Sequence, residues 1–90
     1  MSRNYLITGG AGFIGSYLAE AYLNCGHEVY VIDDLSTGHL GNIAHLMEHP
    51  RFQFVNETIR NDSVMDRLVS DCDIIYHLAA AVGVELIIKD

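Results

Sequence analysis

The chain has 90 residues, and its 5 Lys and Arg against 12 Asp and Glu give a formal net charge of −7 at pH 7. This length allows one small domain of the usual ~100–150 residues, or a piece of a larger one, and leaves no room for a separate substrate domain. The acidic balance offers no basic stripe for nucleic-acid phosphates, and a hydrophobic content of 50% argues against disorder.

Neither a signal peptide nor a membrane span is predicted. The apolar stretch near the N-terminus is too short for a signal-peptide core. The longest apolar region, residues 74–88, is interrupted by His77 and Glu85 and is shorter than the ~20 residues that span a bilayer. Cys25 and Cys72 form no C-x-x-C pair, so we expect two buried thiols in a reducing compartment. Together these features predict a soluble, cytoplasmic protein that does not associate with membranes.

Short apolar runs alternate with stretches of helical periodicity along the chain. The four expected strands are residues 4–8, 29–32, 52–55 and 73–78. The expected helical segments are residues 14–25, residues 42–48, and a third helix with Asp62 or Ser63 as its N-cap.

The boundaries and apolar faces of these helices follow from particular residues. The first helix is expected to end at Gly26, the second before Pro50, and the third to carry a Ser63–Asp66 capping pattern. The expected apolar face of the first helix consists of Ile14, Leu18, Ala21, Tyr22 and Cys25. That of the third consists of Val64, Leu68 and either Val69 or Met65.

This alternation is typical of βαβ units. Right-handed crossovers would place four parallel strands in the order 3-2-1-4, so we expect an α/β fold with the N-terminal part of a Rossmann-type doubly wound parallel sheet. Residues 1–90 would then form a partial dinucleotide-binding domain without its substrate domain. The fourth strand would be an exposed, aggregation-prone edge, which favours the N-terminal portion of a longer protein.

A glycine-rich loop, residues 8–15, lies between the first strand and the first helix. Gly10, Gly12 and Gly15 fit G-x-G-x-x-G, and the segment also fits T-G-x-x-G-x-x-G from Thr8. Glycines allow a tight turn and a close approach of phosphate to a helix N-terminus. A glycine turn that only lets the helix approach the sheet is the structural alternative. A P-loop is rejected, because Ser16 stands where the required lysine would be.

Two carboxylates follow the second strand. Asp33 lies 18 residues beyond Gly15, where an acidic residue binds the adenosine ribose hydroxyls, and Asp34 adds a second negative charge. Both would repel a 2′-phosphate, and no arginine lies in the loop 33–41. We therefore expect NAD rather than NADP as the cofactor. A solvated turn is the alternative interpretation of both carboxylates.

With the segments 8–15, 33–38 and 76–84, the sequence resembles the extended short-chain dehydrogenase/reductases, specifically the NAD-dependent epimerase/dehydratase group acting on nucleotide sugars. The resemblance covers essentially all 90 residues but only about the first third of a family member. It implies an NAD-dependent epimerase, dehydratase or decarboxylase that transiently oxidises a sugar hydroxyl, works as a homodimer and binds its nucleotide sugar with residues beyond this chain. The cofactor-binding residues it implies here are Gly9, Gly12, Phe13, Ile14, Gly15, Asp33, Asp34, Ser36, Thr37, Gly38, Thr58, Ile59, Leu78, Ala79 and Ala80.

The chain departs from the family in two respects. Thr58 stands where the family has an aspartate that binds the adenine amino group, so adenine recognition is weakened, with Glu57 as a candidate for compensation. The catalytic Tyr-x-x-x-Lys pair is absent, since the sole lysine, Lys89, follows no tyrosine at that spacing. The chain alone is therefore expected to be inactive, and it holds no catalytic residue. A non-catalytic dinucleotide-binding or interaction module stays open as the alternative.

Histidines suggest one further possibility. His45, Glu48 and His49 match the H-x-x-E-H pattern of inverted zinc peptidases. Pro50 disfavours the required helix and no third ligand is evident, so a solvated helix end is the preferred interpretation and no metal is expected. His77, at the end of the fourth strand, is expected to have a structural role near the cofactor.

Overall fold

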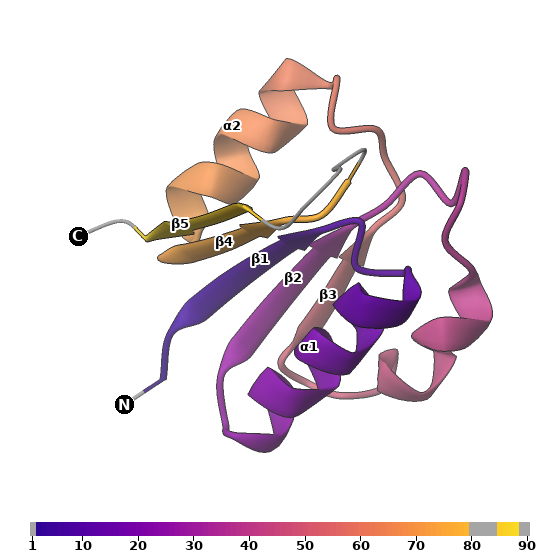
Figure 1. Cartoon of the computed structure of the whole chain (residues 1–90). Coiled ribbons are helices and arrows are strands. Elements are labelled where there is room, and N and C mark those ends of the chain that lie inside the picture. Colours follow the sequence, from indigo (N-terminus) through magenta and orange to yellow (C-terminus); the bar gives the residue numbers. More distant parts are fainter. Residues whose placement is uncertain (1, 80–84, 89–90) are drawn as a thin grey trace.

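The computed structural model describes residues 2–79 and 85–88, which form a five-stranded sheet with helices on both faces (Figure 1). In chain order the elements are β1 (Asn4–Thr8), α1 (Phe13–Asn24), β2 (Glu28–Ile32), the 3₁₀ turns η1 (Leu40–Asn42) and η2 (Ala44–Leu46), β3 (Phe52–Val55), α2 (Asp62–Asp71), β4 (Ile74–His77) and β5 (Glu85–Ile88). Within this part of the chain, neither α-helix has the length and hydrophobicity to cross a bilayer.

The sheet order is β3-β2-β1-β4-β5. The first four strands are parallel, so the predicted 3-2-1-4 Rossmann order is confirmed, with Tyr5 of β1 opposite Val29 of β2 and Ile74 of β4. The expectation that β4 is an open edge is wrong, because β5 pairs with it in antiparallel orientation. A strand edge presents unpaired backbone groups, and the isoleucine-rich segment that follows satisfies those of β4.

The two faces of the sheet carry separate hydrophobic clusters. Alternate residues of β1 point to opposite faces, so Tyr5 and Ile7 pack toward α1 while Leu6 packs toward Leu68 of α2. Figure 1 shows α1 and the 3₁₀ turns on one face and α2 on the other. Because β1 and β2 are covered on both faces, their side chains form near-continuous apolar runs, and Ile7 and Leu6 have no exposed surface.

The buried face of α1 differs from the prediction. The helix buries Gly15, Ser16, Ala19 and Leu23. Leu18 and Tyr22 of the predicted face are half-buried against the core, whereas Ile14 is 60% exposed and Ala21 and Cys25 are also exposed. The expectation that both cysteines are buried therefore holds for Cys72 alone. Small side chains at Gly15 and Ala19 let the helix lie close to the sheet, and the helix is rotated so that these two residues, and not Ile14, face the sheet.

Two helix predictions need correction. Residues 42–48 form no regular helix; the short η1 and η2 turns occupy this region. The N-cap of α2 is Asn61, one residue before the predicted candidates, and its side chain accepts a hydrogen bond from Val64 N at 3.3 Å. Asparagine is among the preferred N-cap residues, because its short side-chain oxygen reaches an unpaired backbone N–H of the first turn.

Three tyrosines pack together on the α1 face. The rings of Tyr5 and Tyr22 stack with centroids 3.9 Å apart, and the hydroxyl of Tyr22 bonds that of Tyr76 from β4. Burial, and after it the hydrogen bond to Tyr76, raises the pKa of Tyr22 well above its ordinary value. The tyrosine cluster thus joins α1 to β1 and β4 through neutral phenols.

Candidate functional site

A cavity of about 790 Å³ lies at the carboxyl ends of the parallel strands, between the first helix and the loops that follow β2, β3 and β4. Its lining consists of Gly9, Gly12, Phe13, Ile14, Gly15, Ile32, Asp33, Asp34, Ser36, Thr37, Gly38, Glu57, Thr58, Ile59, Arg60, Leu78 and Ala79. In open α/β sheets this edge, at the point where the strand order reverses, is where ligands bind. Here the reversal lies between β1 and β4.

The glycine loop forms one wall of the cavity. Gly9 turns the chain out of β1 with φ +72°, a conformation that favours glycine, and its N–H donates to Ile32 O at 2.8 Å. A Cβ on Gly15 would lie 2.7 Å from Gly10 Cα, and one on Gly10 would lie 2.5 Å from a methyl of Val31. Gly10 and Gly15 are therefore required by the close packing of the loop, α1 and β2.

Gly12 has a different reason to be glycine. A Cβ there would meet only the Gly9 carbonyl oxygen, at 3.3 Å, and its φ of −75° suits any residue. It is also the N-cap of α1, where no side chain caps the helix and no acidic residue lies in the first turn. The first N–H groups of a helix carry partial positive charge, so this wall of the cavity is suited to bind an anion.

Asp33 lies at the end of β2 and is 8% exposed. One carboxylate oxygen accepts a hydrogen bond from Ala11 N at 2.9 Å, and the other accepts from Leu35 N at 2.7 Å. The second bond supports the left-handed φ of +64° at Leu35. Gly38 leaves space for this carboxylate, because a Cβ there would lie 2.8 Å from Asp33 Oδ2. Each oxygen keeps a lone pair that can accept a hydrogen bond from a hydroxyl in the cavity.

Asp34 is exposed at the cavity rim. Its side chain accepts a hydrogen bond from Ser36 N at 2.9 Å. Hydrogen bonds from the Ser36 side chain and backbone, and more weakly the positive charge of Arg60, lower the pKa of Asp34. The rim of the cavity therefore carries an ionised carboxylate next to the buried one at Asp33.

Thr8 joins the ends of β1 and β4. Its fully buried hydroxyl oxygen accepts hydrogen bonds from Leu78 N at 3.0 Å and Ala79 N at 3.1 Å. With both lone pairs used, its hydrogen is donated to His77 Nδ1 at 2.8 Å. The expected structural role of His77 agrees with this contact. Thr8 thereby fixes the backbone of Leu78 and Ala79 where it borders the cavity.

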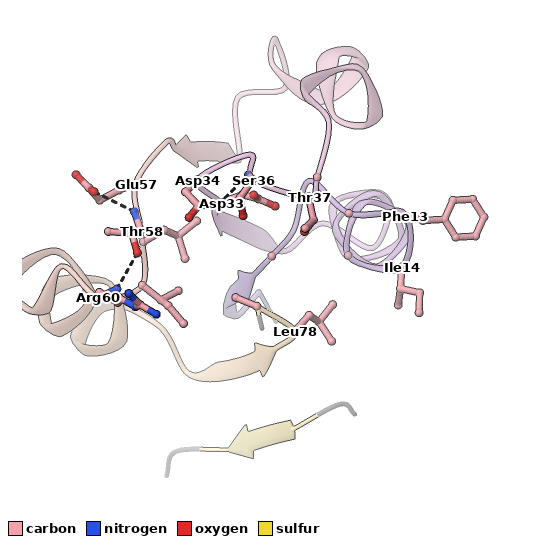
Figure 2. A pocket seen from close by; sticks show the side chains of 17 residues that line it. Phe13, Ile14, Asp33, Asp34, Ser36, Thr37, Glu57, Thr58, Arg60 and Leu78 are labelled. Atoms are coloured by element: carbon pink, nitrogen blue, oxygen red, sulfur yellow. Dashed lines mark hydrogen bonds between the residues drawn. The ribbon is translucent and has the colours of Figure 1, made fainter. Parts of the chain in front are cut away.

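The loop after β3 forms the wall opposite α1. Glu57 accepts from Thr58 N at 2.9 Å, and its carboxylate points away from the cavity in Figure 2. The Thr58 hydroxyl accepts from Arg60 N at 3.2 Å, which closes a tight local turn. In the same view the ring of Phe13 points away from the cavity, so Phe13 borders it mainly through the helix N-terminus.

The structure brings all but one of the candidate site residues to this single cavity. The exception, Ala80, lies outside the described residues. Ile32 and Arg60 line the cavity without having been predicted, and Glu57, which was considered only as compensation for Thr58, lines it as well. Ile32 directly precedes the candidate Asp33, and Glu57 directly precedes the candidate Thr58, so their positions in the sequence alone would have predicted them. Arg60 directly follows the candidate Ile59, but it is positively charged, whereas every candidate is neutral or acidic.

The histidines of the possible zinc motif do not converge. His45 Nε2 contacts Glu20 Oε1 at 2.7 Å, whereas His49 Nδ1 accepts a hydrogen bond from Arg51 N at 3.1 Å. The regular helix that would place the two histidines on one face is replaced by η2. Among the described residues, no group of three metal-ligating side chains is found.

Comparisons with known proteins point to one group of enzymes. The sequence model of the GDP-mannose 4,6 dehydratase family matches residues 6–90. UDP-glucuronic acid decarboxylase 1 of Danio rerio is 41% identical over 78 residues, which cover 87% of this chain and 18% of that protein. Among solved structures, dTDP-glucose 4,6-dehydratase from Bacillus anthracis in complex with NAD aligns with a TM-score of 0.81 and 31% identity, over 87% of this chain and 27% of that one.

A third protein extends the range of reactions. UDP-glucose 4-epimerase from Thermotoga maritima, solved with UDP-glucose, aligns with a TM-score of 0.72 and 34% identity, over 89% of this chain and 25% of that one. The three similar proteins are thus a decarboxylase, a dehydratase and an epimerase. The chain spans between 18% and 27% of the length of these three proteins.

Proposed function

Because this chain belongs to the GDP-mannose 4,6 dehydratase family, within the NAD-dependent epimerases and dehydratases, we propose that it is the NAD-binding portion of an enzyme acting on a nucleotide sugar. The chain spans only 18–27% of the similar proteins, so the activity belongs to a larger protein in this proposal. Residues 1–90 would be a partial Rossmann domain whose substrate domain is not in this sequence. The family resemblance extends the proposal to a cytoplasmic homodimer.

The observation that carries the proposal is the pairing of an uncapped helix N-terminus with a buried carboxylate across one cavity. The N–H groups that follow Gly12 would hold the pyrophosphate. The free lone pairs of Asp33 would accept hydrogen bonds from the adenosine ribose hydroxyls. The Leu78–Ala79 backbone, fixed by Thr8, would border the nicotinamide ribose at the β4 side. The residues present therefore fit the cofactor.

The proposal assigns binding and orientation to this chain, and the proton transfer to residues outside it. Bound NAD supplies a hydride acceptor for a sugar hydroxyl carbon. None of the 5 tyrosines is followed by lysine four residues later, so the Tyr-x-x-x-Lys pair of the family is not within these residues. We therefore propose that the chain alone binds the cofactor without turning over a sugar.

Preference for NAD over NADP follows from the charges at the ribose. A 2′-phosphate would be placed near Asp33, which is buried, and Asp34, which stays ionised because hydrogen bonds from Ser36 lower its pKa. Like charges at this range repel, and burial of one of them reduces screening. We expect NADP to bind at least about tenfold more weakly than NAD, a difference of ~1.4 kcal/mol.

Isothermal titration of the chain with NAD and then with NADP tests the proposal. Gly12→Ala is the informative variant, because Gly12 lines the cavity at the N-terminus of α1 and its added methyl group would meet only one carbonyl oxygen of the protein. It should weaken NAD binding about tenfold with little change in the urea unfolding midpoint. Gly41→Ala, whose Cβ meets nothing within 4 Å, is the matched control. A folded chain that binds no NAD, or that binds NADP equally well, would contradict the proposal.

A further inference from the structure

Arg60 is the single positively charged side chain among the described residues that line the cavity. It shares the lining with three acidic residues, Asp33, Asp34 and Glu57. Figure 2 shows it beside Thr58, at the end of the cavity remote from Phe13 and Ile14. Arg60 lies away from the helix N-terminus that is suited to bind the pyrophosphate. Its positive charge therefore has another role than binding the pyrophosphate.

The backbone around Arg60 is held in place on both sides. Arg60 N donates to the Thr58 hydroxyl at 3.2 Å, and Asn61 N donates to Thr58 O at 3.1 Å. Asn61 then caps α2 through Val64 N. The turn and the helix cap therefore fix the point from which the side chain extends, so the ordering cost of placing it on a ligand falls mainly on its own rotamers.

The Arg60 guanidinium forms no hydrogen bond or ion pair with the part of the protein that the structure describes. In the described part of the chain, Arg60 makes no side-chain hydrogen bond or ion pair within 4.0 Å, in contrast to Arg51, whose guanidinium donates to Gly26 O. The Asp34 carboxylate lies near enough to feel its charge but does not form a salt bridge with it. A planar cation with unused donors is thus available at the rim of the cavity.

The order of the strands tells which part of a dinucleotide would reach Arg60. The glycine loop follows β1, Asp33 follows β2 and Arg60 follows β3, and these strands are adjacent in the order β1, β2, β3. A cofactor with its pyrophosphate at the glycine loop and its adenosine ribose at Asp33 therefore extends its base toward the loop after β3. β4, which borders the other half of the cofactor, lies on the opposite side of β1.

Resting on the proposed function, we propose that Arg60 is a specificity-determining residue whose planar guanidinium stacks on the adenine ring of NAD. Guanidinium groups are planar and weakly hydrated, and they stack on aromatic faces in a way that the compact ammonium of lysine does not. The contact takes the base as its partner and leaves the phosphates to the helix terminus. The stacking contact would also bind the base at the wall formed by the loop after β3. The Thr58 hydroxyl at this wall already accepts a hydrogen bond from Arg60 N.

Titration of the chain with NAD and with AMP, for wild type, Arg60→Ala, Arg60→Lys and Arg67→Ala, tests this proposal. Arg67 lies exposed on α2, outside the cavity lining, and controls for the loss of one positive charge. Arg60→Ala should weaken both ligands about tenfold, and Arg60→Lys should weaken them nearly as much, because a lysine keeps the charge but lacks the stacking plane. Arg67→Ala should change neither affinity by more than about twofold.

The outcomes separate this inference from the proposed function. If wild type and Arg60→Ala bind NAD equally, the stacking role is overturned while the proposed function stands. Full affinity in Arg60→Lys would identify a charge contact and would also overturn it. A loss for NAD without a loss for AMP would place the contact outside the base half and overturn it. Failure of folded wild-type chain to bind NAD would remove both proposals together.

Discussion

Replacement of Thr8 with valine removes one buried hydroxyl and little else. Valine keeps the β-branched shape, but it cannot accept from Ala79 N or donate to His77 Nδ1. Leu78 N loses the hydroxyl as well but keeps its second partner, Thr8 O, at 3.1 Å. Two polar groups are therefore left without their partners, each at a cost of about 1–3 kcal/mol, with the lower half of the range applying because both sites are half-buried.

We therefore expect Thr8→Val to lower the free energy of unfolding by about 2–4 kcal/mol, a large part of the ~5–15 kcal/mol that is typical of a domain. Urea unfolding followed by far-UV circular dichroism measures this difference. Thr8→Ser keeps the hydroxyl and loses a buried methyl group, so it should cost only about 1 kcal/mol. Thr37→Val, at an exposed position, controls for the exchange itself. The reasoning is refuted if the valine variant is as stable as the serine variant.

Two other expectations concern packing and alkaline pH. Gly15→Ala places a Cβ 2.7 Å from Gly10 Cα and should cost about 1–3 kcal/mol in urea unfolding, whereas Gly41→Ala, with open space around its Cβ, should stay within ~0.5 kcal/mol of wild type; equal costs would contradict the packing account. Since the folded chain raises the pKa of Tyr22, through burial first and the bond to Tyr76 second, stability is fully present below the ordinary tyrosine pKa of 10.0 and falls as pH rises beyond it. The urea midpoint of Tyr22→Phe should therefore drop less than that of wild type between pH 8 and pH 11, and an equal drop would count against this role.

The cavity lining could be predicted because its residues lie where strands end. Gly9 follows β1, Asp33 follows β2 and Leu78 follows β4 directly in the sequence. Parallel strands bring their carboxyl ends to one edge of the sheet, so positions that are dozens of residues apart converge without any knowledge of side-chain contacts. The first four strands could be predicted from their continuous apolar runs, which strands buried on both faces require, whereas β5 was not predicted.

Other features depend on competition that a linear pattern does not express. The helical spacing of α1 is compatible with burying Ile14, but the small side chains of Gly15 and Ala19 allow a closer approach to the sheet and decide the rotation. Asn61, Asp62 and Ser63 are all good N-cap residues, and tertiary placement of the preceding turn selects the first. The direction of the exposed Arg60 side chain likewise depends on the turn formed by Thr58 and Asn61.

The two hydrogen bonds that Asp33 accepts limit how this cleft can change over evolution. Its carboxylate ties the glycine loop, at Ala11, to the loop after β2, where it also supports the left-handed Leu35. A substitution that removed its charge to admit another cofactor would also release two loops and leave backbone N–H groups unpaired. Asp34 is exposed and accepts a hydrogen bond from its neighbour Ser36, so it does not hold two loops together. Evolution or engineering toward a different cofactor can therefore replace Asp34 with little structural cost, whereas replacement of Asp33 would destabilise both loops.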